Sequence, residues 1–228
     1  MLDRINTLVN QVYQQELAQK NAEIEALQAQ INPHFLYNTL DSVNWMLIAR
    51  GEMDISAVVV ALGKLMQYSM DTARAMVSLE EEYRNVRDYL MIQKNRLEDR
   101  LEFTLELDEP LKCFPVPKLI LQPLVENAIK YGIEPSLQPG HILVRTRKTD
   151  DDIQILVKDN GCGMDEAQLT FYRRLLRNDP SGQTNIGVRN VARRLQLHFG
   201  GRCGFDVSSR PGDGLSITIR IPAQEEQP

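Results

Sequence analysis

The stretch Leu101-Glu-Phe-Thr-Leu-Glu-Leu107 alternates apolar and polar residues, which predicts a β-strand with one buried face. The sequence before this stretch carries helical spacing, whereas the sequence after it mixes strand and helix patterns. We therefore predict a fold of class α+β, in which helices come first and a mixed layer of strands and helices follows. The change of period places a domain boundary near residues 98–101, without a linker of the Gly/Ser type.

The first helical segment has the pattern of a short coiled coil. Leu17, Ile24 and Ile31 fall seven residues apart, and Leu27 lies on the same stripe. A solvated single helix is the alternative, but such a helix is marginally stable without a partner. We therefore expect residues 1–32 to pair with a second copy.

Three further helices follow before the boundary. Helix-compatible sequence covers residues 33–50 and, after a turn, residues 55–70, with Asp54 as the expected N-cap of the second helix. Ser78-Leu-Glu-Glu81 matches a capping box and opens a helix that ends near Glu98. Long helices joined by a short turn resemble half of a four-helix bundle, which a homodimer would complete.

Strand and helix signals mix after the boundary. A sheet with helices on one face is the expected arrangement. The expected strands, besides the first, are residues 142–146, 153–157, 203–208 and 215–221, and the expected helices are residues 118–131, 166–177 and 187–199.

Composition narrows the classes of function. The chain has 228 residues with 43% hydrophobic and 25% charged residues, typical of a folded globular protein. Its 26 Lys and Arg against 31 Asp and Glu give a net charge of −5, which argues against a nucleic-acid partner. No apolar run approaches the roughly 20 residues that span a bilayer, so we expect no membrane contact by this chain. Three widely spaced cysteines favour a reducing compartment.

The strongest local motif is Asn32-Pro33-His34-Phe35-Leu36-Tyr37-Asn38. Its proline either kinks a continuous helix or starts a new one after an Asn cap, and both readings fit locally. Neutral imidazole is a competent nucleophile at pH 7, so His34 is a candidate for covalent chemistry. Asn38 follows one helical turn later on the same face, where it can position a water or a phosphoryl oxygen. A hydrogen-bonded core histidine is the alternative.

A second group of polar residues lies within Gln122–Tyr131. Asn127 stands three and four residues before Lys130 and Tyr131, so the three share one helical face. An Asn amide oxygen suits Mg²⁺, and a nearby lysine suits phosphate. A solvated polar face is the alternative.

Glycines follow the predicted strand 153–157 in Lys158-Asp-Asn-Gly-Cys-Gly-Met164. Gly161 and Gly163 permit a tight turn and the close approach of a planar ligand. Asp159, at the end of the strand, can accept a hydrogen bond from an exocyclic amine. A plain glycine turn is the alternative.

Two more glycines accompany a set of basic residues. Gly187 stands where a loop meets a helix start, and free N–H groups there attract phosphate. Gly214 precedes the last strand, either in a hairpin turn or as a backbone gap for a ligand. Six arginines flank the Gly187 loop and fit a polyanion, or else a solvated helix surface: Arg173, Arg174, Arg177, Arg189, Arg193 and Arg194.

In this order, the motifs resemble those of a sensor histidine kinase. The His34 block, with Leu-Val-Glu-Asn-Ala-Ile-Lys-Tyr131 and Asn185-Ile-Gly-Val-Arg-Asn-Val191, closely resembles the LytS-type (autolysin-regulator) class of two-component kinases. The resemblance covers roughly residues 25–222. It implies a signalling coiled coil (1–32), a dimerisation and phosphotransfer hairpin (33–98) and a Bergerat-type (GHKL) ATP-binding domain (99–228).

The resemblance also implies roles for single residues. His34 would accept the γ-phosphoryl group of ATP and pass it to an aspartate of a response regulator. For Asn38, the i to i+4 spacing from His34, strengthened by the resemblance, predicts a role in dephosphorylation of that partner, and a hydrogen bond within the bundle or a cap at the Pro33 kink is the alternative. Asn127 would bind Mg²⁺ and Lys130 a phosphate, and Asp159 would read adenine. The remaining nucleotide contacts would be Tyr131, Gly161, Gly163, Gly187 at the end of the ATP lid, and Gly214.

Three departures from the resemblance keep other functions open. Phe35 stands where other kinase classes place an acidic general base, Pro123 replaces the first Asn of the Asn-box, and Asn185 replaces a common glycine. A nucleotide-gated dimerisation scaffold without phosphotransfer is therefore the main alternative. A serine kinase of the anti-sigma type is a third reading, which leaves the His34 block unexplained. For the kinase, the resemblance implies the cytoplasmic part of a longer membrane sensor.

Overall fold

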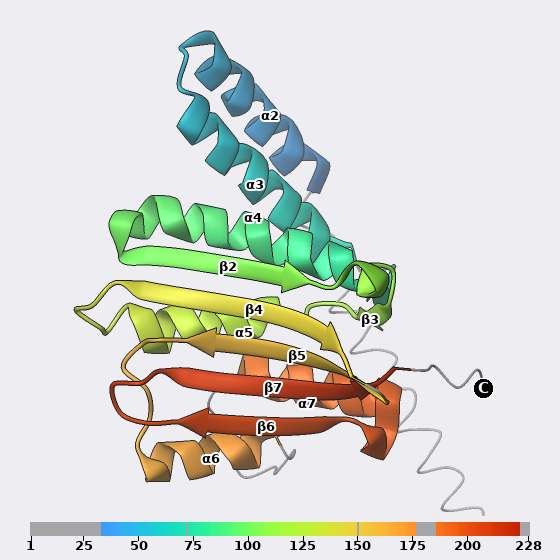
Figure 1. Ribbon diagram of the computed structural model, residues 1–228. Coiled ribbons are helices and arrows are strands. Elements are labelled where there is room, and N and C mark those ends of the chain that lie inside the picture. The colour runs from blue at the N-terminus through green and yellow to red at the C-terminus, as the bar shows by residue number, and fades with distance from the viewer. Residues whose placement is uncertain (1–32, 72, 150, 177–185, 224–228) are drawn as a thin grey trace, which may run out of the picture.

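The computed structural model describes residues 33–71, 73–149, 151–176 and 186–223. In it, a helical hairpin projects from a layer of helices that covers a sheet (Figure 1). The coiled coil predicted for residues 1–32 lies outside the described residues. No described helix combines the length and apolar character needed to cross a membrane.

The projecting hairpin consists of α2 (Pro33–Ala49) and α3 (Met53–Met70). Gly51 has a φ of 76° in the turn between them, a left-handed conformation that glycine adopts without strain. The prediction that Asp54 caps α3 is wrong. Glu52 holds the N-cap position without a side-chain cap bond, and Asp54 lies in the first helical turn, where its charge still favours the helix dipole.

The capping box predicted at Ser78 is confirmed at the start of α4 (Leu79–Leu97). The Ser78 hydroxyl accepts from the Glu81 N–H at 3.2 Å, and the Glu81 carboxylate accepts from the Ser78 N–H at 2.9 Å. Helix α4 buries Val86 and Leu90 completely, in the same hydrophobic core as the sheet. The change from helix to strand near residues 98–101 therefore lies between two elements, α4 and the sheet, that share one hydrophobic core.

Five strands form the main sheet, in the order β2-β4-β5-β7-β6. Strands β2 and β4 are parallel, and every other neighbouring pair is antiparallel. The bounds are β2 Leu101–Leu107, β4 Gly140–Lys148, β5 Asp152–Asp159, β6 Gly204–Ser209 and β7 Leu215–Pro222. A small second sheet pairs β1 (Met76–Ser78) with β3 (Pro115–Pro117).

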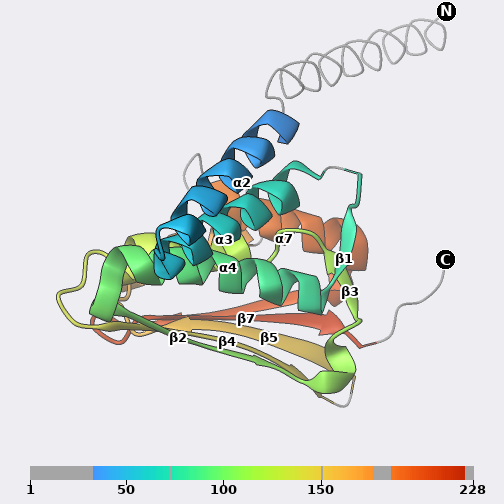
Figure 2. The ribbon, with the colours of Figure 1, turned by 90° about the horizontal axis from the view of Figure 1, so that it is seen from above.

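Helices cover one face of the main sheet, as predicted (Figure 2). They are α4, α5 (Gln122–Asn127), α6 (Glu166–Leu176) and α7 (Ile186–Phe199). Burial alternates along each central strand. Ile217, Ile219 and Ile221 of β7 are buried, while the residues between them are half-buried. The period of two thus places one set of side chains in the core and the other on the open face.

The helix expected over residues 118–131 is shorter and shifted. It begins at Gln122 and continues from Ala128 to Ile133 as the π-helical turn η3. Leu119 has a φ of 60°, so the chain ahead of α5 is not helical. The N–H groups of residues 119–121 are bound instead by the side chain of Glu82.

Glu82 lies at the junction of the hairpin with the sheet layer. It is fully buried on α4 and accepts from the backbone N–H groups of Leu119, Ile120 and Leu121 at 2.6, 2.8 and 2.9 Å. The Tyr68 hydroxyl of α3 donates to the same carboxylate. One side chain therefore joins α3, α4 and the segment that leads into α5.

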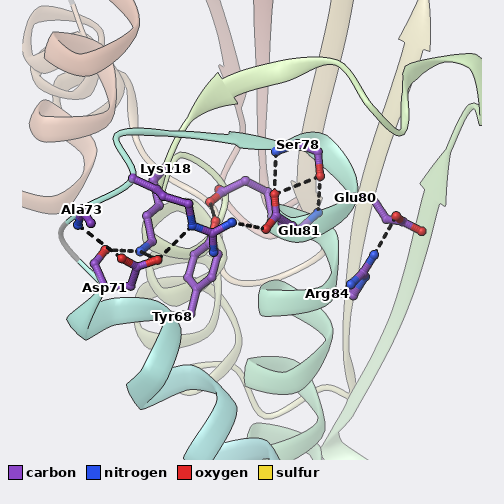
Figure 3. A network of polar contacts seen from close by, with 10 residues as sticks. Tyr68, Asp71, Ala73, Ser78, Glu80, Glu81, Arg84 and Lys118 are labelled. Carbon is purple, nitrogen blue, oxygen red and sulfur yellow. Dashed lines mark hydrogen bonds and ion pairs between the residues drawn. The ribbon is translucent and has the colours of Figure 1, made fainter. Parts of the chain in front are cut away.

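Lys118 adds a second set of contacts at this junction (Figure 3). Its Nζ lies 4.7 Å from the centre of the Tyr68 ring and donates to the carbonyl of Asp71. Arg74 donates to the carboxylates of Asp71 at 3.0 Å and Glu81 at 2.9 Å. These contacts hold the end of α3 against the start of α4.

Candidate nucleotide site and phosphoacceptor

An open cavity of about 270 Å³ lies at the ends of β5 and β7, beneath α6 and beside η3. Its size is close to the lower limit of small-ligand pockets. Its walls are mostly apolar, with a few polar groups. The lining residues are Asn127, Tyr131, Gly132, Asp159, Cys162, Gly163, Met164, Gln168, Phe171, Tyr172 and Leu215.

Asp159 is the buried charge of this cavity. It ends β5 on the face that also carries Ile155 and Val157, so strand alternation directs it toward the helices. It is 3% exposed, and its Oδ1 accepts from the N–H groups of Gly161 at 2.9 Å and Leu215 at 3.3 Å. Burial raises the pKa of this carboxyl, and the two backbone donors lower it. The two backbone donors thus fix the Asp159 carboxyl at the wall of the cavity.

The nearby glycines are required by backbone packing. Gly163 has a φ of 67°, and a Cβ there would lie 1.9 Å from the carbonyl oxygen of Arg210. Gly214 has a φ of 77°, and a Cβ there would lie 2.0 Å from the carbonyl oxygen of Asp159. A Cβ on Gly161 would lie 2.2 Å from the Gly132 carbonyl carbon. These close approaches fix the loop around Asp159. Of the three glycines, only Gly163 lines the cavity.

The predicted group on one helical face is divided by the structure. Asn127 lines the cavity, and its Nδ2 donates to the Pro123 carbonyl at 2.9 Å, which leaves the amide oxygen for a ligand. Tyr131 also lines the cavity. Lys130 is exposed outside the lining, with its Nζ 5.1 Å from the centre of the Tyr131 ring.

The residues present fit a Mg²⁺ ion that arrives with a nucleotide. The described residues contain no group of three or more His, Cys, Asp or Glu side chains able to hold a metal. Mg²⁺ is commonly held by one or two protein oxygens, with waters and substrate phosphates as its other ligands. The Asn127 oxygen is a suitable protein ligand of that kind.

Two of the six flanking arginines contact backbone carbonyl groups. Arg173 donates to the Val207 carbonyl at 3.0 Å, and Arg194 donates to the carbonyls of Lys118 and Leu119 at 2.9 and 3.1 Å. These two side chains therefore hold backbone in place. Arg177 and the segment that precedes α7 lie outside the described residues.

Gly187 lies in the first turn of α7 and does not line the cavity. A Cβ there would meet the Pro123 side chain at 3.4 Å, an ordinary contact distance. Its predicted place at the end of an ATP lid stays a prediction.

Several lining residues were not predicted from the sequence. In the loop of Gly161 and Gly163 and in α6, the sequence had indicated no ligand-binding residues other than the glycines and arginines. The structure adds four lining residues there: Cys162, Met164, Gln168 and Phe171. Gly132 was also missed, although a Cβ there would lie 2.7 Å from Asp159 Oδ1. The position of this glycine, directly after Lys130 and Tyr131, was the feature of the sequence that could have indicated a close approach to the site.

His34 lies outside this cavity, in the first turn of α2. Its side chain is exposed, which excludes the core-histidine alternative. Asn38 lies one turn later, and its Nδ2 is 3.3 Å from His34 Nδ1, so the predicted proximity on one face is confirmed. No residue of α2 or α3 lines the cavity.

One chain thus carries an exposed histidine on a helix and a buried aspartate at an apolar cavity. The family described as "Histidine kinase" matches residues 22–101, and the family "Histidine kinase-, DNA gyrase B-, and HSP90-like ATPase" matches residues 116–225. The chain belongs to the histidine kinase family, and its residues 116–225 match this ATPase family.

Relatives carry the same description. The sensor histidine kinase YesM of Bacillus subtilis (strain 168) is 42% identical over 226 residues, which cover 99% of this chain and 38% of that protein. The sensor protein kinase HptS of Staphylococcus aureus (strain USA300) is 27% identical over 215 residues, which cover 94% of this chain and 41% of that protein. The chain thus spans about two fifths of the length of the curated relatives it matches.

Among solved structures, the histidine kinase domain of the Erythrobacter litoralis EL346 blue-light activated kinase is similar to this chain. The TM-score is 0.49 at 18% sequence identity, over 83% of this chain and 93% of that chain.

Proposed function

We propose that this chain binds Mg²⁺·ATP in the cavity at Asp159, transfers the γ-phosphoryl group to His34 and then passes it to an aspartate of a response regulator. The observation that carries the proposal is the exposed His34 on a helix of the same chain that holds the ATPase-family cavity. Such a kinase portion works on the cytoplasmic side of a two-component sensor, where ATP and the regulator are present.

The geometry around His34 supports a role as nucleophile. The structure places the Asn38 amide nitrogen against Nδ1, where its N–H donates to the neutral imidazole and leaves the ring proton on Nε2. Attack through Nε2 requires the other tautomer, which Asn38 holds when its amide turns to place the oxygen against Nδ1–H. Nε2 then forms the bond to phosphorus while the bond between phosphorus and the ADP oxygen breaks. The resulting imidazolium loses a proton to solvent, because Phe35 supplies no base.

The chemistry requires that His34 and the cavity meet. Because no hairpin residue lines the cavity, transfer requires either a rearrangement of the hairpin or the hairpin of a partner subunit. Phosphoryl transfer depends mainly on positioning and charge neutralisation, which Mg²⁺ with Asn127 supplies when the nucleotide is bound.

We also propose a homodimer formed through the hairpin. Trp45 and Met46 of α2 are 69% and 55% exposed, and Met53 and Ile55 of α3 are 61% and 50% exposed. Large apolar side chains gathered on one exposed hairpin are typical of an interaction surface. A second hairpin would cover them and complete a four-helix bundle.

Incubation with ATP labelled at the γ-phosphate tests the kinase proposal. We expect a protein-bound label that is lost in acid and stable in alkali, as a phosphohistidine is. Binding of ATP without any label would instead support the dimerisation scaffold, which the absence of an acidic residue after His34 motivates. A label that survives acid would indicate a serine kinase.

Asn127→Asp is expected to lower the autophosphorylation rate on the order of 10- to 100-fold, a range typical of changed groups around a metal site. A carboxylate cannot donate to the Pro123 carbonyl, and it repels the phosphates of the nucleotide. The rate of label incorporation measures this effect. Glu126→Gln is the matched control, because Glu126 is exposed on the same helix and does not line the cavity. A full rate in Asn127→Asp would remove the Mg²⁺ assignment.

Asn38→Ala is expected to reduce regulator dephosphorylation more than formation of phospho-His34. Its amide lies beside the imidazole on the exposed face of α2, where it can orient a water against an aspartyl-phosphate of a docked regulator. Both reactions are measured side by side with purified regulator. An equal loss of both, with a lowered melting temperature, would show that Asn38 is structural.

A further inference from the structure

Tyr172 is a buried tyrosine whose hydroxyl is not hydrogen-bonded. It is 2% exposed on α6, and its hydroxyl has no hydrogen-bond partner in the described part of the chain. Leu169 and Leu176, three residues before and four after, lie on the same buried face of the helix. The hydroxyl is therefore a polar atom on an otherwise apolar face.

The position of this hydroxyl connects it to the cavity. Tyr172 lines the cavity together with Asp159. The Asp159 carboxylate lies near enough to add to the effect of burial, and both raise the pKa of the Tyr172 hydroxyl. The phenol consequently stays protonated at neutral pH, as an unpartnered hydrogen-bond donor on a residue that lines the same cavity as an acceptor.

Packing alone gives no reason for the hydroxyl. Phenylalanine would fill the same apolar space without a buried donor, and an unpaired buried donor lowers stability. An unpaired buried polar group in a native structure is rare and indicates a specific role or an absent partner. The cavity beside Tyr172 is a place where a ligand can supply that partner.

We propose that the Tyr172 hydroxyl donates a hydrogen bond to the ring nitrogen of adenine that adjoins the exocyclic amine, and so acts as a nucleotide-binding residue. The inference rests on the proposed function, in which Asp159 accepts from that amine. The amine donates and the adjoining N1 accepts, so a carboxylate and a hydroxyl of two residues that line one cavity match the two atoms. Guanine carries an oxygen and an N–H at these positions, and the pair discriminates against it.

Tyr172→Phe tests this assignment through two effects of opposite sign. The nucleotide-free variant is expected to melt at the same or a higher temperature, because the unpaired donor is gone. Its Kd for Mg²⁺·ADP, measured by calorimetry, is expected to rise roughly 3- to 10-fold, the value of one hydrogen bond. An unchanged Kd would overturn the proposal.

Tyr83→Phe is the matched control. The buried Tyr83 hydroxyl donates to the Glu106 carbonyl at 2.9 Å or shares a hydrogen with Thr146 Oγ1 at 2.8 Å, and Tyr83 does not line the cavity. Loss of the Tyr83 hydroxyl in Tyr83→Phe is expected to lower the melting temperature and to leave the Kd for Mg²⁺·ADP unchanged. The two tyrosine variants thus separate a binding role from a packing role.

The 1-deaza analogue of ADP, which lacks the N1 acceptor, identifies the bonded atom. The unmodified chain is expected to bind it more weakly than ADP, whereas Tyr172→Phe is expected to bind both equally. If Tyr172→Phe raises the Kd of ADP and of the 1-deaza analogue by the same factor, Tyr172 acts by shaping the pocket, and the proposed hydrogen bond to N1 is wrong. If the unmodified chain binds no adenine nucleotide, the proposed function itself fails.

Discussion

His34→Ala is expected to abolish the acid-labile label formed from γ-labelled ATP. Alanine has no lone pair to attack phosphorus, so the loss should be complete rather than partial. The fold should survive, because His34 is exposed and substitutions at such sites usually change stability within about 0.5 kcal/mol. Label incorporation, nucleotide affinity and melting temperature are measured together, and only the first should change.

The two other histidines of the chain provide controls for this variant. His141 on β4 contacts Thr104 at 2.9 Å through its Nε2, and His198 lies near the end of α7. His141→Ala and His198→Ala should both keep the label. Label that persists in His34→Ala would remove this residue as the phosphoacceptor and would direct the search to these two side chains.

The elements that the sequence predicts well depend on short-range patterns. The sequence of 215–221 predicted a strand, and the structure has β7 there, with burial that alternates along it. The Ser78 capping box needs only four consecutive residues and was confirmed. Local periodicity and capping are properties of neighbouring residues, so they can be read without knowledge of the fold.

Long-range contacts could not be read from these patterns. The parallel pairing of β2 with β4 joins residues about 39 apart, as in the register of Leu101 with Gly140. The burial of Glu82 depends on a loop nearly 40 residues later, and a charged residue in the run Glu80-Glu81-Glu82 is typically exposed. The start of α5 was misplaced for the same reason, because the Glu82 contacts hold residues 119–121 out of the helix.

The candidate site shows the same division. Asp159, Asn127 and Gly163 were predicted from motifs, and the structure places all three at one cavity. Tyr172 was not predicted as a site residue, because its helical spacing with Leu169 and Leu176 is that of ordinary core residues. The hydroxyl became informative only when the structure showed that it lacks a partner.

Glu82→Met is expected to lower stability by about 3 kcal/mol. The substitution leaves the N–H groups of Leu119, Ile120 and Leu121 buried without their acceptor, at roughly 1 kcal/mol or more for each. Because about 1 kcal/mol shifts the melting temperature of a chain this size by roughly 2–4 °C, we expect a decrease of roughly 6–12 °C. Thermal unfolding followed by circular dichroism measures it.

Glu80→Met is the matched control on the same helix turn. Glu80 is partly exposed and pairs with Arg84 at 2.7 Å, and exposed ion pairs contribute about 0–1 kcal/mol. If the melting temperature falls no further in Glu82→Met than in Glu80→Met, the buried carboxylate has no structural role.

The pH dependence of unfolding gives an independent test of the same group. Burial raises the pKa of Glu82 despite its four hydrogen-bond donors, so the folded chain holds the proton more tightly than the unfolded chain. The contribution of Glu82 to the free energy of unfolding is therefore greatest below the ordinary glutamate pKa of about 4.3 and declines as pH rises toward the folded value. Glu82→Gln has no such titration, so the free energy of unfolding of the unmodified chain should fall relative to that of this variant as pH rises above about 4.3. A free energy of unfolding that instead rises relative to that of Glu82→Gln as pH rises would mean that the four donors outweigh burial and that Glu82 is held as a carboxylate.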